Sequence, residues 1–194
     1  MANTADIRRG LFLKYEGALL QVEFFQHVKP GKGAAFVRTK LRNVITGEII
    51  ERTFHADEQL ETAQVDRKNA TFQYQEGTTY IFMDPDTYDQ YQVSEEVLGQ
   101  ARWYLDENTP YDVVFHEGRA VAVEPPTTVV REVVDTEPSM KQDTSGVTMK
   151  PARISSGLEV QVPLFCAVGD KIKIDTRTGD YLGRIDERAS ASSP

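Results

Sequence analysis

The sequence predicts an all-β protein made of three small barrels. Short runs of β-forming residues recur along the chain, and turn signals that contain glycine separate them. With 194 residues the chain is long for one compact domain. Three small barrels fit this length and strand spacing better than one large sandwich. We expect domains at residues 1–64, 65–128 and 129–187, followed by a disordered tail at 188–194.

The first domain is predicted to hold two β-hairpins. Residues 10–25 form strands on either side of a Glu-Gly turn, and residues 34–54 form strands on either side of a Thr-Gly turn. Both runs alternate apolar and polar residues, as a half-buried strand does. A small antiparallel barrel is therefore expected at the N-terminus.

Between these hairpins lies the stretch HVKPGKGAAF, residues 27–36. Pro30 restricts one backbone φ angle, while Gly31 and Gly33 can adopt positive φ and allow close approach of another backbone. The stretch is predicted to be a projecting turn with Lys32 at its tip. Hairpin geometry alone does not require a cation at that place.

Residues 24–47 contain basic side chains and no acidic one. Within them, Arg38, Lys40 and Arg42 share the parity of one strand and should stand on one face beside the turn. Such a local positive surface suggests a specific polyanionic partner. An ordinary solvated face is the alternative.

The second domain is predicted to contain hairpins at 71–83 and 111–126, each about a Glu-Gly turn. Between them, Ser94 can cap a short helix. The third domain begins near residue 129 and returns to strands from residue 152 onward. Its Cys166 lies in an apolar run and is expected to be a buried small hydrophobe in a reducing compartment.

The net charge of −8 argues against a general nucleic-acid coat protein, and the middle third of the chain carries the acidic excess. No apolar stretch is long enough to span a membrane, and the N-terminus lacks the apolar core of a secretion signal. We therefore expect a cytoplasmic protein without a membrane partner.

No constellation for catalysis is visible in the sequence. The segment GKGAAF satisfies neither phosphate-loop pattern, and His27, His55 and His116 stand without partners at metal-ligand spacing. Residues 84–89, DPDTYD, lack the glycine of a calcium loop and are expected to form a solvated acidic turn. We expect no enzyme activity, no metal and no cofactor.

Four stretches together resemble the bacterial elongation factor P family. They are HVKPGKGAAFVRTKLRN at 27–43, Pro-Pro at 125–126, VVDTEP at 133–138, and KPARISSGLEVQVPLFCAVGDKIKIDTRTGDYLGR at 150–184. The resemblance covers nearly the whole chain in the right order. The hypusine-bearing factor of archaea and eukaryotes is similar over the first two domains only.

The resemblance implies an L-shaped arrangement of three barrels, an N-terminal SH3-like (KOW-like) domain followed by two OB-fold domains. It implies a monomeric translation factor that binds both ribosomal subunits between the peptidyl and exit sites, contacts peptidyl-tRNA, stimulates peptide-bond formation and relieves stalling at consecutive prolines. Lys32 matches the tip residue that a lysine-modifying enzyme extends in this family, by β-lysylation or with an amino-alcohol.

The resemblance also implies residues that contact tRNA or ribosomal RNA. In the third domain, Gln142 stands where the family's loop has glycine. Tyr181 could equally pack on its barrel. The implied RNA-binding residues are Lys29, Pro30, Gly31, Lys32, Gly33, Arg38, Lys40, Arg42, Asp143, Thr144, Lys150, Arg177, Tyr181 and Arg184.

Two other functions stay open at this point. One is an elongation-factor-P-like paralogue with a different set of stalled substrates. The other is a general single-stranded RNA-binding OB-fold protein, which would need aromatic side chains interleaved with basic ones in a groove. Domains two and three show no such interleaving in the sequence.

Overall fold

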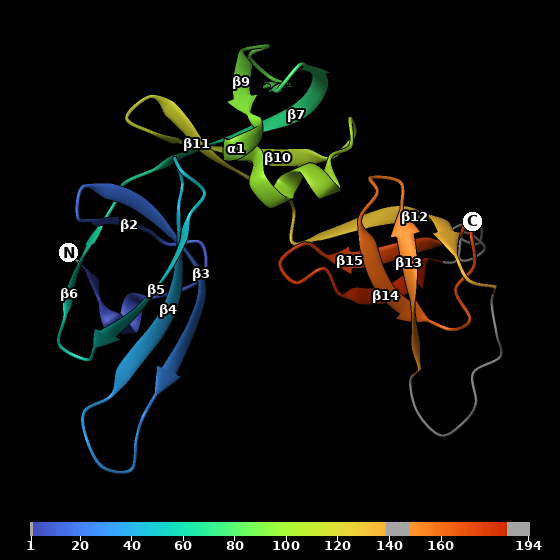
Figure 1. Cartoon of the computed structure of the whole chain (residues 1–194). Coiled ribbons are helices and arrows are strands. Elements are labelled where there is room, and N and C mark those ends of the chain that lie inside the picture. Colours follow the sequence, from blue (N-terminus) through green and yellow to red (C-terminus); the bar gives the residue numbers. More distant parts are fainter. Residues whose placement is uncertain (1, 139–147, 186–194) are drawn as a thin grey trace, which may run out of the picture. The chain divides into compact units, whose positions relative to one another are not determined.

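A computed structural model describes residues 2–138 and 148–185, and its strands form three sheets (Figure 1). This confirms the predicted all-β class with three β domains. The limits predicted for the individual domains stay predictions. Within the described residues, no helix has the length and apolar character that crossing a membrane requires.

The first sheet has the strand order β1-β6-β2-β3-β4-β5. Its inward side chains pack into one core, in which Leu13, Leu41 and Phe54 are almost fully buried. A short 3-10 helix, η1 (Thr4–Asp6), follows β1. The strands are β1 (Ala2–Asn3), β2 (Phe12–Tyr15), β3 (Ala18–Val28), β4 (Phe36–Asn43), β5 (Ile49–His55) and β6 (Gln59–Thr62).

The second sheet has the order β11-β10-β7-β8-β9, and β9 also lies against β11, so the sheet curves toward closure. The Ser94 hydroxyl accepts a hydrogen bond from the Val97 N–H at 3.4 Å, which confirms the predicted helix cap. The elements are β7 (Asp66–Glu76), β8 (Thr79–Met83), β9 (Gln90–Ser94), α1 (Glu95–Leu98), η2 (Gly99–Tyr104), β10 (Pro110–His116) and β11 (Arg119–Glu124).

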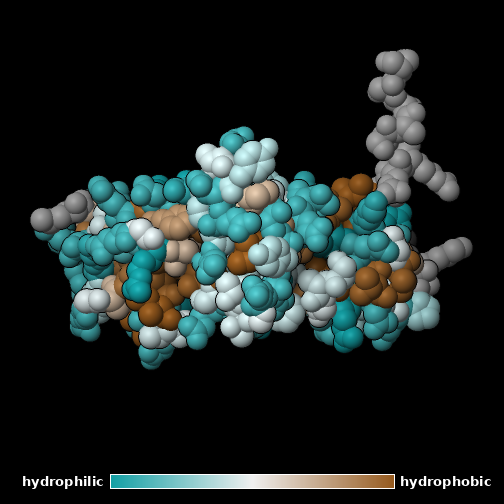
Figure 2. Space-filling view, turned by 90° about the horizontal axis from the view of Figure 1, so that it is seen from above, coloured by the Kyte–Doolittle hydropathy of each residue, from teal (hydrophilic) through white to brown (hydrophobic). Residues whose placement is uncertain are grey.

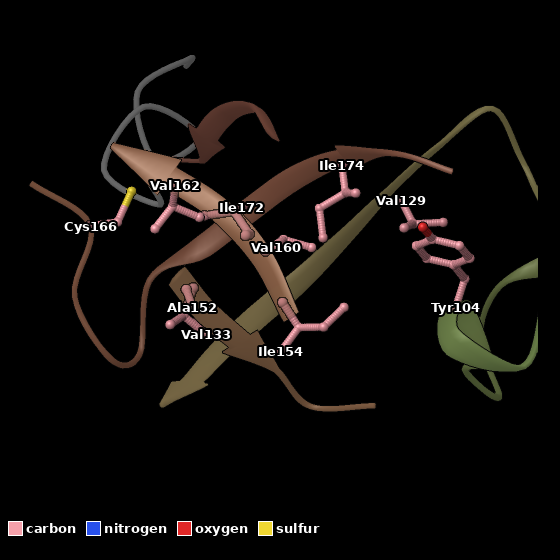
Figure 3. Packing of buried hydrophobic residues seen from close by; sticks show 10 residues of the cluster. All are labelled: Tyr104, Val129, Val133, Ala152, Ile154, Val160, Val162, Cys166, Ile172 and Ile174. Atoms are coloured by element: carbon pink, nitrogen blue, oxygen red, sulfur yellow. The ribbon is translucent and has the colours of Figure 1, made fainter. Parts of the chain in front are cut away.

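The third sheet has the order β14-β13-β12-β15-β16, and β14 lies against β16. Branched aliphatic side chains fill its core, and Cys166 is buried at one end of that core, as predicted (Figure 3). The strands are β12 (Thr128–Thr136), β13 (Met149–Ile154), β14 (Glu159–Pro163), β15 (Lys171–Asp175) and β16 (Tyr181–Ile185).

Two of the predicted Glu-Gly turns have the left-handed backbone that tight hairpins need. Glu16 and Gly17 have φ of 49° and 79°, and Glu117 and Gly118 have φ of 50° and 78°. Positive φ at both central residues matches the right-handed twist of the flanking strands. The sequence therefore located these hairpins correctly, even though glutamate is an unusual residue at positive φ.

By its internal contacts the chain divides into two compact units. The first holds residues 1–99 and 112–124, and the second holds residues 100–111 and 125–194. In the first unit, Phe12 and Leu19 of the N-terminal sheet share an apolar cluster with Val114 and Val121 of the second sheet. The first two barrels are therefore joined by a buried apolar contact.

The segment 100–111 belongs to the second compact unit, together with the C-terminal barrel. Arg131 is 7% exposed, and its guanidinium donates hydrogen bonds to the carbonyls of Tyr104 and Val130. The Tyr111 hydroxyl donates to the same Tyr104 carbonyl at 2.7 Å. The buried arginine thus ties this segment to β12, because a buried charge needs hydrogen-bond acceptors and the Tyr104 carbonyl is one of them.

Replacing Phe12 should weaken the contact between the first two barrels. We expect Phe12→Ala to lower the free energy of unfolding by about 3–5 kcal/mol, because it leaves a cavity where a fully buried ring was. Urea unfolding followed by circular dichroism measures this. The matched control is Ile49→Ala, which removes a side chain that is 55% exposed and should change stability by less than about 0.5 kcal/mol. Equal urea midpoints for the two variants would contradict the assignment of Phe12 to the apolar contact between the first two barrels.

Candidate functional site

The loop at residues 29–35 joins β3 to β4 and forms the end of a long hairpin (Figure 1). The strands stay paired up to Val28 and Phe36, so the loop is held at the end of the ladder. Its residues from 29 to 34 are all exposed. In the part of the chain that the structure describes, no hydrogen bond or ion pair engages Lys32. This loop is the projecting turn that the sequence predicted.

The two glycines beside Lys32, Gly31 and Gly33, differ in backbone conformation. Gly33 has φ of +109°, a conformation that side chains rarely adopt, whereas Gly31 is not among the positive-φ glycines. A Cβ added to Gly31 would meet nothing within 4 Å. The backbone therefore requires glycine at position 33 only, and nothing within the described chain requires it at position 31.

The basic residues of β4 stand on one face, as their parity predicted. Val37, Thr39 and Leu41 are buried, and the intervening Arg38 and Lys40 are exposed. We call Arg38 and Lys40 the cationic face. Lys40 pairs with Glu51 at 3.2 Å, but both side chains are more than half exposed, so the pair leaves the lysine accessible.

Arg42 has the predicted parity but different surroundings. Its guanidinium pairs with Glu23 at 2.8 Å and donates to the Gln21 side-chain oxygen at 2.9 Å. Gln21 in turn contacts Glu124, which Arg67 binds at 2.9 Å. This network within the first unit favours a structural role for Arg42. The stretch is free of acids in sequence, but Glu23 and Glu51 flank it in space.

Two features of β3 were missed by sequence reasoning. The ladder shifts between Val22 and Phe24, which marks a β-bulge at Glu23. Phe24 consequently lies on the outer side, 51% exposed and directly opposite Lys40. The adjacent Phe24 and Phe25 are the signal in the sequence. A regular strand places adjacent side chains on opposite faces, so one of the two rings has to face outward.

Lys150 occupies a buried position in the third barrel. It is 3% exposed, and its ammonium donates to the Glu137 carbonyl at 2.5 Å and to the Pro138 carbonyl at 3.3 Å. These bonds hold the end of β12 beside β13, so the geometry favours a structural role. Asp143 and Thr144, with Gln142, lie outside the described residues.

The remaining predicted residues border β15 and β16. The guanidinium of Arg177 binds both carboxylate oxygens of Asp175, at 2.8 and 3.1 Å, beside the turn between these strands. Arg184 lies 3.5 Å from the Asp170 carboxylate and over the ring of Phe165. Both cations thus have intramolecular acidic partners, which compete with any phosphate.

Tyr181 packs against the core of the third barrel and lies beside Cys166. Burial raises the pKa of its hydroxyl, and the charge of the Cys166 thiolate and a hydrogen bond with that sulfur add to the effect, to about 12. Burial likewise raises the pKa of Cys166. The packing alternative for Tyr181 therefore has direct support.

The acidic turn at 84–89 uses one carboxylate to hold its own backbone. An oxygen of Asp84 accepts hydrogen bonds from the N–H groups of Asp86 and Thr87, at 2.8 and 3.2 Å. These bonds lower the pKa of Asp84 below its usual range. The arrangement is an Asx turn, in which the side chain imitates a backbone carbonyl.

Three family models match the chain in sequence order. The elongation factor P KOW-like domain matches residues 3–60, the elongation factor P OB domain matches residues 65–123, and the elongation factor P C-terminal model matches residues 129–184. Each match covers most of one of the three sheets.

Full-length relatives agree with these models. The elongation factor P of Mycolicibacterium vanbaalenii is 47% identical over 186 residues, which is 96% of this chain and the whole of that relative. That of Mycobacterium avium has the same identity and coverage. Among solved structures, the eukaryotic translation initiation factor 5A from Methanococcus jannaschii is similar over 64% of this chain and 91% of its own, at 17% identity and a TM-score of 0.47.

The raised pKa of Tyr181 should appear as a loss of stability at high pH. The folded state keeps the hydroxyl proton up to about pH 12, whereas the unfolded chain releases it near 10.0. Its contribution to stability is therefore complete below pH 10.0 and declines as the pH rises toward 12. Urea unfolding at increasing pH should show a steeper decline for the parent than for Tyr181→Phe. Tyr88→Phe, which changes a side chain that is 72% exposed, should follow the parent; identical slopes for parent and Tyr181→Phe would refute this.

Proposed function

This chain belongs to the elongation factor P family of translation elongation factors, and from that membership we propose that it binds the ribosome between the peptidyl and exit sites and contacts peptidyl-tRNA. In this proposal it stimulates peptide-bond formation and relieves stalling at consecutive prolines. The protein works in the cytoplasm as a monomer, without a cofactor and without catalytic groups of its own.

The loop at residues 29–35 is the observation that carries the proposal. The long ladder of β3 and β4 ends in a narrow tip. At this tip Lys32 stands between Gly31 and Gly33, which have no side chains. Gly31 is open on its Cβ side although the fold does not need it to be. A tip of this shape suits entry into a crowded cavity, where a side chain at position 31 would meet the partner.

Positioning is the chemistry that such a tip can supply. Proline is a slow, conformationally restricted participant in peptide-bond formation. Holding the peptidyl-tRNA in a reactive pose lowers the barrier by removing unfavourable orientational freedom, and it needs no acid or base from the factor. The ammonium of Lys32 contributes charge and hydrogen-bond donors to the RNA at that place.

Cations along the hairpin would hold the RNA backbone. Lys29, Lys32 and the cationic face contact phosphate and sugar, which fixes position without selecting sequence and makes affinity depend on salt. The bonds of Arg42 to Glu23 and Gln21 favour a structural role, and its contact with RNA stays a prediction. Contacts by Asp143, Thr144, Lys150, Arg177, Tyr181 and Arg184 with tRNA or the small subunit rest on family likeness alone.

Lys32 is also the proposed target of a lysine-modifying enzyme. Its side chain is exposed at a loop tip, where an enzyme can reach it without unfolding the protein. An extension would carry the cationic group further from the hairpin. Intact-mass spectrometry of natively produced protein, followed by peptide mapping, tests this proposal, and an added mass that maps to any other residue would refute it.

Removing the Lys32 side chain should abolish the activity and leave the fold intact. In a reconstituted translation system with a proline-run template, we expect Lys32→Ala to slow peptide-bond formation about tenfold or more, because the reacting ends lose their support. Thermal unfolding should match the parent. The matched control is Lys14→Ala, which removes the same charge from an exposed site in β2. Equal rates for the parent and Lys32→Ala would contradict the proposed function.

The shape of the tip can be tested separately from its charge. We expect Gly31→Ala to change stability by less than about 0.5 kcal/mol, because the new Cβ meets nothing within the protein. The same variant should slow translation of the proline-run template, because that Cβ faces the proposed RNA cavity. Gly33→Ala should disturb the loop itself, since its φ is +109°. Full activity of Gly31→Ala would show that the tip does not enter a crowded site.

A further inference from the structure

Phe24 is an exposed aromatic side chain beside the proposed RNA-binding hairpin. Apolar side chains reach the surface at several places on the face that Figure 2 shows. The Phe24 side chain is 51% exposed. Lys40 lies directly opposite it on β4, and Arg38 is the next outward residue along that strand. Phe24 therefore stands on the cationic face rather than in isolation.

The bulge at Glu23 is what puts Phe24 outside. Val22 faces inward opposite Leu41 and is 1% exposed, so regular alternation would turn residue 24 inward as well. The extra residue shifts the parity by one. Phe25 then pairs with Thr39 and packs against the core, and Phe24 takes the outer position opposite Lys40.

An ion pair holds this bulge. The Glu23 carboxylate lies 2.8 Å from the Arg42 guanidinium, and both side chains are partly buried, with 34% and 19% of their surface exposed. Arg42 is in turn bound to Gln21. The outward position of Phe24 is therefore fixed by the contacts of Glu23, Arg42 and Gln21, and it does not depend on the solvent-exposed loop.

The neighbours of Phe24 have the chemistry of a surface for unpaired nucleotides. The guanidinium of Arg38 lies 5.6 Å from the centre of the Phe36 ring, so the cationic face carries a second aromatic beside its cations. Exposed rings stack on bases, and nearby cations hold the phosphates on either side. Lys40 and Arg38 are cations of one accessible face, which favours a polyanionic partner over a protein surface.

We propose that Phe24 is a stacking platform for an unpaired nucleotide of the RNA partner, with Arg38 and Lys40 holding the flanking phosphates. This inference rests on the proposed function, because it takes RNA as the partner of the hairpin. It adds a base contact to a surface otherwise expected to touch only phosphate and sugar. Single-stranded RNA should consequently bind here better than duplex RNA of the same length.

The test measures binding of the full chain to a short single-stranded RNA that contains 2-aminopurine, whose fluorescence falls when it stacks. We expect Phe24→Leu to weaken binding about fivefold to a hundredfold and to remove the fluorescence change, because leucine keeps the apolar area and loses the ring. Phe24→Trp should retain both. Ile45→Ala, which removes an apolar side chain that is 65% exposed in the turn between β4 and β5, should bind like the parent.

Salt dependence separates stacking from charge. Phe24→Leu should leave the slope of log affinity against log salt unchanged. The double variant Arg38→Gln, Lys40→Gln should lower that slope by about 1.4, which corresponds to two phosphates of a single strand. A duplex of the same sequence should show no dependence on Phe24.

Three results would overturn the inference. They are equal binding by Phe24→Leu and the parent, an equal loss on duplex RNA, and sedimentation that shows a parent dimer which Phe24→Leu dissolves. None of these results changes the outcome expected for Lys32→Ala in the translation assay. If Lys32→Ala fails to slow translation, the proposed function falls whatever the RNA-binding result, so the two failures are distinguishable.

Discussion

The alternation of side chains across β4 is the constraint on which the candidate site depends. Val37, Thr39 and Leu41 must face the core of the first sheet, and a strand that buries them has to present Arg38 and Lys40 on its other side. The same ladder continues to Val28 and Phe36 and so carries the loop at residues 29–35 on two paired strands. The strand pairing that buries Val37, Thr39 and Leu41 therefore also exposes Arg38 and Lys40.

Cations in this molecule divide by what they already bind. Lys150 and Arg131 satisfy buried carbonyl groups, and Arg177 is bound to a carboxylate at its own turn. Turning such a group toward a phosphate would leave its present acceptors unpaired, which costs roughly what the new contact gains. Lys32 makes no hydrogen bond or ion pair within the described residues. The loop at residues 29–35 thus presents at its tip a positive charge that is available to a partner.

Much of the fold could be predicted because its signals are local. Glu-Gly turns, strand parity in β4 and the Ser94 cap each depend on a few adjacent residues, and the structure has them at the predicted positions. What failed was non-local. The sequence could not show that Glu23 and Glu51 approach the basic strand, because partners across a sheet are set by register. Nor could it show that Lys150 is buried, since lysine is ordinarily an exposed residue.

The division of the chain between its two units has a practical consequence for cutting the protein into parts. Residues 100–111 interrupt the second sheet, yet Tyr104 packs in the core of the C-terminal barrel, and its carbonyl accepts from Arg131. A fragment that stops after Glu124 would keep Tyr104 but lack the core that covers it, and its aromatic ring would meet water. Such a fragment should stick to itself or to other surfaces, and its behaviour would then say little about the first two barrels in the intact protein.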